Sequence, residues 1–281
     1  MATEPLWTLD EVLSATKGRV MGHPRATAHG VAIDSRTLED GDIFIAIKGD
    51  THDGHAFVSM ALAKGAAFAI VAADHISALS HDGRYVVVDD PFEAMRRLGR
   101  AARARVAGRI VAVTGSVGKT STKEALRLVL GAQGKTHAAV ASFNNHWGVP
   151  LTLARMPRDV AYGVFEIGMN HAGEITPLTQ MVRPHVTIIT TVAPVHLEFF
   201  PEEGVVGIAK AKAEIFDGLE PGGTMIVNRD IDTFETVATA ARAANGTLET
   251  FGESAGADHR LEKVGLTADY SSVSAHIGGH D

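Results

Sequence analysis

A glycine-rich turn with one lysine is the part of this sequence best suited to hold a phosphate group. It follows the apolar run 110–113 and precedes a long stretch of helical periodicity. Glycine lets backbone N–H groups curl around phosphate oxygens, a helix N-terminus adds a positive dipole, a lysine adds charge, and a threonine hydroxyl can bind magnesium. We therefore predict a nucleoside-triphosphate site. Its residues are Gly115, Ser116, Val117, Gly118, Lys119, Thr120 and Ser121.

The turn departs from the general phosphate-loop pattern G-x-x-x-x-G-K-[ST] at one position, because Val113 stands where the first glycine is expected. The alternative is a turn whose lysine faces solvent. The strand before the turn and the amphipathic helix after it favour the phosphate site. The expected apolar face of that helix consists of Thr122, Ala125, Leu126, Val129 and Leu130.

Two further polar residues follow apolar runs. Glu166 comes directly after residues 162–165, and His196 follows residues 186–192. The carboxyl ends of parallel strands meet at one edge of a sheet, where α/β proteins bind ligands. On this pattern alone, a structural role for either residue stays open.

Lys212 lies in a predicted helix over residues 204–219. Its neighbours at helical spacing are mostly apolar, whereas Lys210 lies on the polar side near Glu214. Lys212 is therefore expected to point inward, and desolvation would lower its pKa and leave more neutral amine. The alternative is a lysine whose ammonium reaches out to solvent from a half-buried face.

The elements that must position these side chains alternate between short apolar strands and helical stretches, which is typical of α/β folds with largely parallel sheets. Strand-like runs at 31–33 and 43–47 begin a small first unit, and the amphipathic stretch 91–105 ends it. A chain of 281 residues has the ordinary length of two domains. We predict a small α/β domain over 1–105 and a P-loop domain with a mostly parallel sheet over 106–281.

The composition argues against several classes of function. A formal net charge of -7 disfavours general binding to nucleic acids or membrane surfaces, so any phosphate must be held in a local pocket. Cysteine is absent, which excludes disulfides, thiolate metal sites and a cysteine nucleophile. The N-terminus lacks the pattern of a signal peptide, and no apolar run approaches the length of a membrane span. We expect a cytoplasmic protein.

The variant T-G-S-V-G-K-T-S-T-K-E resembles the phosphate loop of the Mur ligases and of the related folylpolyglutamate synthases, whose loops also begin with Thr-Gly. Further segments match the Mur ligases in order. They are N-N-H-W-G-V-P from Asn144, E-I-G-M-N-H-A-G-E-I from Glu166, H-L-E from His196 and A-K-A-K-A-E-I-F from Ala209. Three upstream segments, D-S-R from Asp34, K-G from Lys48 and D-G-H from Asp53, resemble the family's UDP-binding domain. The resemblance covers essentially the whole sequence and is greatest to the D-alanyl-D-alanine-adding member.

This resemblance implies an ATP-dependent ligase that uses Mg²⁺ and joins D-alanyl-D-alanine to UDP-N-acetylmuramoyl-tripeptide through an acyl phosphate, in the synthesis of peptidoglycan precursors for the cell wall. It implies UDP-sugar binding by residues 1–105 and ATP binding by residues 106–281. Family members continue into a third, C-terminal domain. We therefore expect that domain to be absent here and this chain alone to have little ligase activity. We also expect a monomer without a nucleic-acid partner.

The resemblance also implies roles for particular residues. Thr120, Glu166 and His196 would bind magnesium, and Lys212 would become carbamylated and help to hold a second magnesium ion. Lys119, Lys212 and His196 would be the catalytic residues. The implied substrate-binding residues are Ser35, Arg36, Lys48, Asp53, His55, Asn144 and Asn145. These last residues lie in or beside turns, so plain surface or turn-forming roles are the alternative.

Two other functions stay open. A ligase on the same scaffold could add diaminopimelate or lysine instead of D-alanyl-D-alanine. A non-catalytic module that binds a nucleotide sugar is the alternative from a different class. A kinase or GTPase explains neither the UDP-domain segments nor an inward Lys212.

Overall fold

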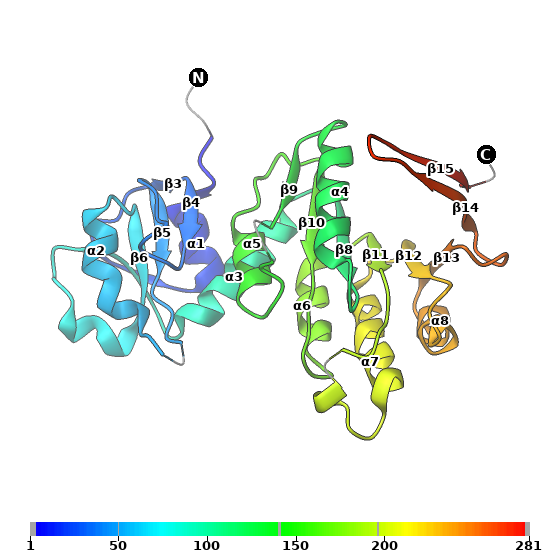
Figure 1. The fold of residues 1–281 in the computed structure, drawn as a ribbon. Coiled ribbons are helices and arrows are strands. Elements are labelled where there is room, and N and C mark those ends of the chain that lie inside the picture. The colour runs from blue at the N-terminus through cyan, green and yellow to red at the C-terminus, as the bar shows by residue number, and fades with distance from the viewer. Residues whose placement is uncertain (1–3, 50, 140–141, 196, 279–281) are drawn as a thin grey trace. The chain divides into compact units, whose positions relative to one another are not determined.

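A computed structural model gives the structure of residues 4–49, 51–139, 142–195 and 197–278. The chain folds into two units, each with its own main sheet. The first comprises the chain up to Ala107 together with Pro150–Asp159, and the second comprises Gly108–Val149 and the chain from Val160 onward. The mixed α/β architecture with mostly parallel sheets agrees with the prediction (Figure 1).

The segment Pro150–Asp159 belongs to the first unit, whereas it lies within the second domain predicted over 106–281. Trp7, which is 1% exposed, donates from Nε1 to the carbonyl of Ala154 at 2.9 Å. Nε of Arg155 donates to the carbonyl of Val31 at 2.6 Å. These contacts join residues far apart in the chain, so no local periodicity reveals them.

The first unit is built on a five-stranded sheet. In spatial order its strands are β2 (Arg19–Gly22), β7 (Arg84–Val88), β6 (Phe68–Ala72), β5 (Asp42–Ile45) and β4 (Gly30–Ala32). Only the β2–β7 pair of this sheet is antiparallel. A second, two-stranded pair joins β1 (Trp7–Thr8) to β3 (Thr27–Ala28). The helices are α1 (Leu9–Thr16), η1 (Gly54–Phe57), α2 (Val58–Ala63), η2 (Ala73–Ala78) and α3 (Pro91–Ala104). α3 agrees with the helix predicted over 91–105.

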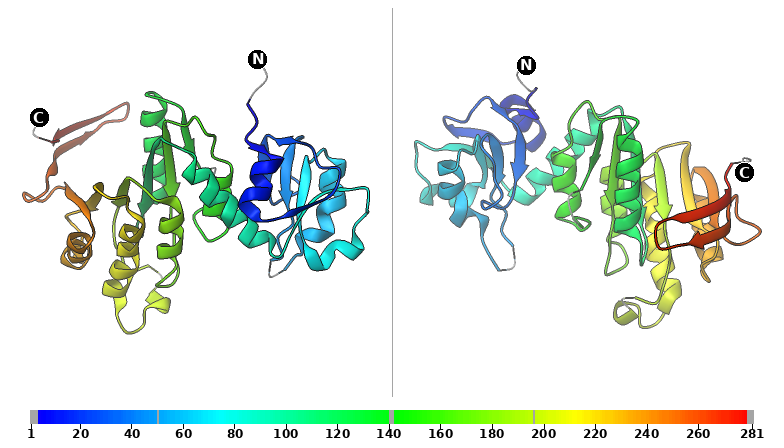
Figure 2. Two further views of the ribbon diagram at one scale, coloured as in Figure 1. Left: turned by 180° about the vertical axis from the view of Figure 1, so that it is seen from behind. Right: turned by 45° about the horizontal axis from the view of Figure 1, so that its top comes forward.

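The second unit is built on an eight-stranded sheet. In spatial order its strands are β9 (Thr136–Ala138), β10 (Tyr162–Glu166), β8 (Arg109–Thr114), β11 (Val186–Ile189), β12 (Gly223–Asn228), β13 (Gly246–Gly252), β14 (His259–Leu266) and β15 (Ser271–His276). All neighbours are parallel except β14 and β15, which form a hairpin at the edge of the sheet (Figure 2). β8 therefore has β10 and β11 as its two neighbours, and the carboxyl ends of these three strands lie together.

Helices connect the strands of the second unit. They are α4 (Lys119–Gly131), α5 (Gly148–Ala154), α6 (Ile175–Val182), η3 (Leu197–Phe199), α7 (Gly204–Ala213), η4 (Glu214–Gly218) and α8 (Phe234–Ala243), and the division between the units falls within α5. α4 packs against β8, β9 and β10, and α8 packs against β12 and β13. None of the helices in the described part of the chain is both long and apolar enough to cross a bilayer.

The buried face of α4 differs from the predicted one. Leu126 and Leu130 pack on the core of the sheet as expected, but Ala125 is exposed and Val129 is 58% exposed. The fully buried position is Lys123, with 0% exposure. The buried face therefore consists of positions 119, 123, 126 and 130, whereas the predicted face consisted of positions 122, 125, 126, 129 and 130. Apolar periodicity could not find it because a charged residue occupies its centre.

Candidate active site

The glycine-rich turn connects β8 to α4 as the sequence predicts. Gly118 caps the N-terminus of α4 with φ +88°, a conformation that favours glycine. Lys119 folds back over the turn and donates to the carbonyl of Gly115 at 2.8 Å. Burial lowers the pKa of Lys119, and the charge of Glu166 opposes this shift. The turn thus combines a helix N-terminus and a half-buried ammonium, which together attract a phosphate.

The segment that follows β11 holds this turn in place. Thr190 donates from Oγ1 to the carbonyl of Val117 at 2.6 Å. The backbone N–H of Ser116 donates to the carbonyl of Thr191 at 2.8 Å. The Ser116 hydroxyl donates to the carbonyl of Ala193 at 3.1 Å and accepts from the N–H of the same residue at 3.0 Å. The hydroxyl of Ser116 therefore anchors the turn, while Val117 and Ser121 are exposed.

Thr120 and Glu166 meet beside the turn. The Thr120 hydroxyl donates to Oε2 of Glu166 at 2.9 Å, and the side-chain amide of Asn144 donates to Oε1 at 2.8 Å. Glu166 is 1% exposed and ends β10 in register with Val113 of β8. A hydroxyl and a carboxylate offer only oxygen ligands, the type that suits magnesium.

The two asparagines have different surroundings. Asn144 contacts Glu166, whereas Oδ1 of Asn145 accepts from the N–H groups of Trp147 and Gly148 at 3.1 and 3.0 Å. The Asn145 side chain therefore caps the start of α5. Asn144 therefore lies at the candidate metal site, and Asn145 holds the loop before α5; their contact with substrate stays a prediction.

Lys212 is 3% exposed in α7, so its side chain points inward as predicted. Burial, together with the nearby charge of Lys119, lowers its pKa to about 8. Lys210 by contrast is exposed and pairs with Glu203 at 2.8 Å. A buried lysine with this pKa carries an appreciable fraction of neutral, nucleophilic amine near neutral pH.

The predicted helix over 204–219 and the predicted strand over 186–192 both end early. α7 ends at Ala213 and is followed by η4. The Glu214 carboxylate in η4 accepts from the N–H of Gly173, before α6, at 2.6 Å and from the N–H of Ile175, the first residue of α6, at 3.1 Å. β11 ends at Ile189. His196, predicted as a metal ligand and catalytic residue, lies outside the described residues.

In the first unit, the predicted UDP-binding residues follow two neighbouring parallel strands. Ser35 and Arg36 follow β4; Ser35 is 5% exposed, and the exposed Arg36 pairs with Asp34 at 2.7 Å. The carbonyls of Ser35 and Arg36 accept from the ammonium of Lys64 at 2.8 and 3.1 Å. Lys48 follows β5, is exposed, and forms an isolated β-bridge with Asp53.

Asp53 and His55 form a hydrogen-bonded cluster with His75, which the sequence analysis did not identify. Nδ1 of His55 lies 2.6 Å from Asp53, and Nε2 of His55 accepts from the N–H of Ala72 at 2.9 Å. The acceptor role of Nε2 places the proton of neutral His55 on Nδ1, so Nδ1 has no free lone pair for a metal. The ring of His75 stacks on that of His55 at 3.8 Å, and its hydrogen bond to Asp74 raises the pKa of His75. Both ring nitrogens of His55 are therefore hydrogen-bonded within the protein.

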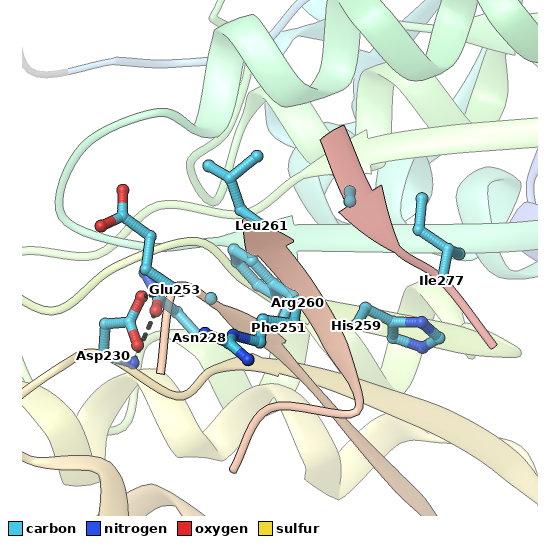
Figure 3. Close-up of a pocket in the computed structure, with 10 residues that line it drawn as sticks. Asn228, Asp230, Phe251, Glu253, His259, Arg260, Leu261 and Ile277 are labelled. Carbon is cyan, nitrogen blue, oxygen red and sulfur yellow. Dashed lines mark hydrogen bonds between the residues drawn. The ribbon is translucent and has the colours of Figure 1, made fainter. Parts of the chain in front are cut away.

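A pocket of about 340 Å³, open to solvent, is lined by residues at the carboxyl ends of β12 and β13 and by residues of the β14–β15 hairpin. Figure 3 shows Asn228, Phe251, His259 and Ile277 among its lining residues. The side-chain amide of Asn228 donates to the carbonyl of Thr190 at 2.9 Å, which links this cavity to the segment that holds the phosphate turn. This pocket was not predicted from the sequence. The polar run N-R-D from Asn228, which ends an apolar strand, is the sequence feature that could have indicated it.

Two family models match the chain. The one described as Mur ligase middle domain matches residues 113–280, which is more than half of the sequence. The one described as Mur ligase family, catalytic domain matches residues 27–105.

Similar proteins carry consistent names. A UDP-N-acetylmuramoyl-tripeptide--D-alanyl-D-alanine ligase of Bacillus subtilis is 33% identical over 259 residues, which are 92% of this chain and 55% of that protein. MurF from Acinetobacter baumannii has a similar structure, with a TM-score of 0.84 at 33% identity, covering 98% of this chain and 59% of the other. MurF ligase from Thermotoga maritima in complex with ADP has a TM-score of 0.75 at 25% identity, and the match covers 89% of this chain and 56% of the other. The chain spans about half the length of the curated relatives it matches.

Proposed function

The chain belongs to the Mur ligase family, and from this premise we propose that it supplies the nucleotide-sugar-binding and ATP-binding units of a ligase that joins D-alanyl-D-alanine to UDP-N-acetylmuramoyl-tripeptide. The observation that carries the proposal is the meeting of Lys119, Thr120 and Glu166 at the ends of adjacent strands. The names of the similar proteins support the choice of substrates.

ATP is proposed to bind with its phosphates in the turn 115–120. The N–H groups of the turn and the start of α4 would hold the phosphate oxygens, and Lys119 would exchange its contact with the Gly115 carbonyl for a phosphate. The cavity beside Asn228 is large enough for a nucleobase and is linked to the turn through Thr190. The proposed use of ATP and a nucleotide sugar suits a cytoplasmic enzyme.

Magnesium fits the donors present at this site. Thr120 and Glu166 offer oxygen atoms within 2.9 Å of each other, and hard divalent cations prefer such ligands. Magnesium bound there would neutralise negative charge on the phosphates during transfer. We propose Thr120 and Glu166 as ligands, with His196 and a modified Lys212 as further candidates.

The proposed reaction has two steps. A carboxylate oxygen of the tripeptide attacks the γ-phosphorus of ATP, the bond to the β-phosphate oxygen breaks, and an acyl phosphate and ADP form. The amine of D-alanyl-D-alanine then attacks the acyl carbon, loses a proton and displaces phosphate. Lys119 would stabilise the charge on the transferring phosphoryl group, and most of the acceleration would come from positioning and electrostatics.

Lys212 is proposed to react with carbon dioxide. Its neutral amine would attack the carbon of CO₂ and release one proton, giving a carbamate whose oxygens could bind a cation. The low exposure and lowered pKa of Lys212 support this step, because they increase the share of neutral amine.

In the first unit we propose that Ser35, Arg36, Lys48 and the cluster around His55 contact the uridine diphosphate.

A substrate assay tests the function. A version of the chain extended with the remaining part of its longer relatives should release phosphate from ATP only when UDP-N-acetylmuramoyl-tripeptide and D-alanyl-D-alanine are both present. Phosphate release that requires diaminopimelate or lysine as the amine, together with a shorter acceptor peptide, would show a ligase of different specificity. Binding of the nucleotide sugar without any ATP consumption would show a non-catalytic module.

A further inference from the structure

Helix α4 buries a lysine where a helix on a sheet usually buries an apolar residue. Lys123 is 0% exposed, while the other residues of this helix are at least partly exposed. Lysine is almost never fully buried unless its ammonium is paired, because loss of hydration is costly. The ammonium of Lys123 therefore needs specific partners, and these indicate its role.

The ammonium joins α4 to the end of β9. Nζ of Lys123 donates to the carbonyl of Ala139, the residue after β9, at 3.0 Å. It also lies 3.0 Å from Oε1 of Glu124, which contacts Arg127 at 2.7 Å. The contact with Ala139 is buried, so water does not readily replace it.

The chain beyond Ala139 leads to the candidate metal site. The hydroxyl of Ser142 lies 3.4 Å from that of Thr120, one turn before Lys123 in α4. Asn144 then donates to Glu166, and its carbonyl accepts from the N–H of Gly168 at 2.8 Å. Helix α4 therefore contacts both Ala139 and Ser142, and Asn144 contacts the buried carboxylate of Glu166.

We propose that Lys123 is a positioning residue for the metal site. By fixing Ala139, it keeps Ser142 and Asn144 in place, so that Asn144 orients Glu166 toward Thr120. Groups that orient metal ligands in this way commonly affect metal affinity as strongly as some ligands do. This inference rests on the proposed function, since it concerns the magnesium site of that function.

The test compares Lys123→Met with the parent 281-residue chain. Methionine fills the same space without the ammonium. ADP binding is measured by calorimetry over a series of Mg²⁺ concentrations. The concentration that gives half of the maximal binding should rise about tenfold, and saturating Mg²⁺ should restore most of the ADP affinity. Amide hydrogen exchange in residues 142–149 should also become faster.

Arg127→Met is the matched control, because it removes the other partner of Glu124 on the exposed side of the same helix and should leave the Mg²⁺ dependence unchanged. If Lys123→Met does not fold, Lys123→Gln replaces it. A folded variant that loses stability but keeps the parent's Mg²⁺ dependence would overturn the inference. If the parent chain itself shows no Mg²⁺-dependent ADP binding, the proposed function fails instead.

Discussion

The hydroxyl of Thr120 donates a 2.9 Å hydrogen bond to Oε2 of Glu166, although 46 positions separate the two residues in the chain. The contact joins the first turn of α4 to the last residue of β10. It exists because β8 and β10 are parallel neighbours whose carboxyl ends lie at the same edge of the sheet. A phosphate in the glycine-rich turn would therefore lie beside a hydroxyl and a buried carboxylate.

Replacement of Lys119 with methionine should weaken ADP binding by roughly 100-fold, or about 3 kcal/mol, because it removes a charged donor from a half-buried phosphate site. Calorimetric titration at fixed Mg²⁺ measures this change. Lys210→Met is the control, since Lys210 is exposed and pairs with Glu203. Equal affinities of parent and Lys119→Met would contradict the assignment of the turn.

Replacement of Lys212 with methionine should stabilise the fold at neutral pH. The pKa of Lys212 falls from 10.5 to about 8 on folding, so the folded state disfavours the charged form. The resulting penalty is complete below about pH 8, at about 3 kcal/mol as an upper bound, and declines to zero as the pH rises toward 10.5.

Urea unfolding of this variant and the parent at several pH values measures the effect. The gain from Lys212→Met should shrink between pH 8 and pH 10.5, and Lys210→Met, at an exposed lysine of the same helix, is the matched control. A stability difference that stays constant over this range would show that the Lys212 ammonium carries no burial penalty.

Replacement of Trp7 with phenylalanine should destabilise the first unit by about 2 kcal/mol, because the carbonyl of Ala154 loses its buried donor. The guanidinium of Arg105 lies 3.8 Å above the Trp7 ring and would also lose part of its contact. Urea unfolding followed by circular dichroism measures the loss. Trp147→Phe is the control, because Trp147 is partly exposed. Equal losses in the free energy of unfolding for the two variants would refute the anchoring role of Trp7.

The two glycines of the phosphate turn should respond differently to alanine. A Cβ at Gly115 would lie 2.0 Å from Oγ1 of Thr190 and displace the residue that holds the turn. A Cβ at Gly118 has its nearest neighbour at 3.6 Å, so Gly118→Ala meets only backbone strain of about 1 kcal/mol. Melting temperature and ADP affinity should fall further for Gly115→Ala than for Gly118→Ala. The reverse order would mean that Thr190 does not fix the turn.

Local patterns predicted the parts of the fold that depend on local sequence. The turn between β8 and α4, the strand that ends at Glu166 and the inward direction of Lys212 all follow from short apolar runs and helical spacing. Parallel strands then bring their ends together, so the meeting of Thr120 and Glu166 could be expected in general terms.

Long-range contacts account for most of what the sequence did not predict. Trp7 and Arg155 draw Pro150–Asp159 into the first unit through partners more than 100 positions away. Lys123 interrupts the apolar face of α4, since its burial depends on a carbonyl beyond β9.

A crystal of the chain grown with a non-hydrolysable ATP analogue and Mn²⁺ in place of Mg²⁺ tests the metal site most directly. The anomalous signal of manganese should lie against Thr120 and Glu166, with the phosphates in the turn that contains Lys119. Phosphates bound elsewhere, or a metal peak remote from Glu166, would contradict the proposed site.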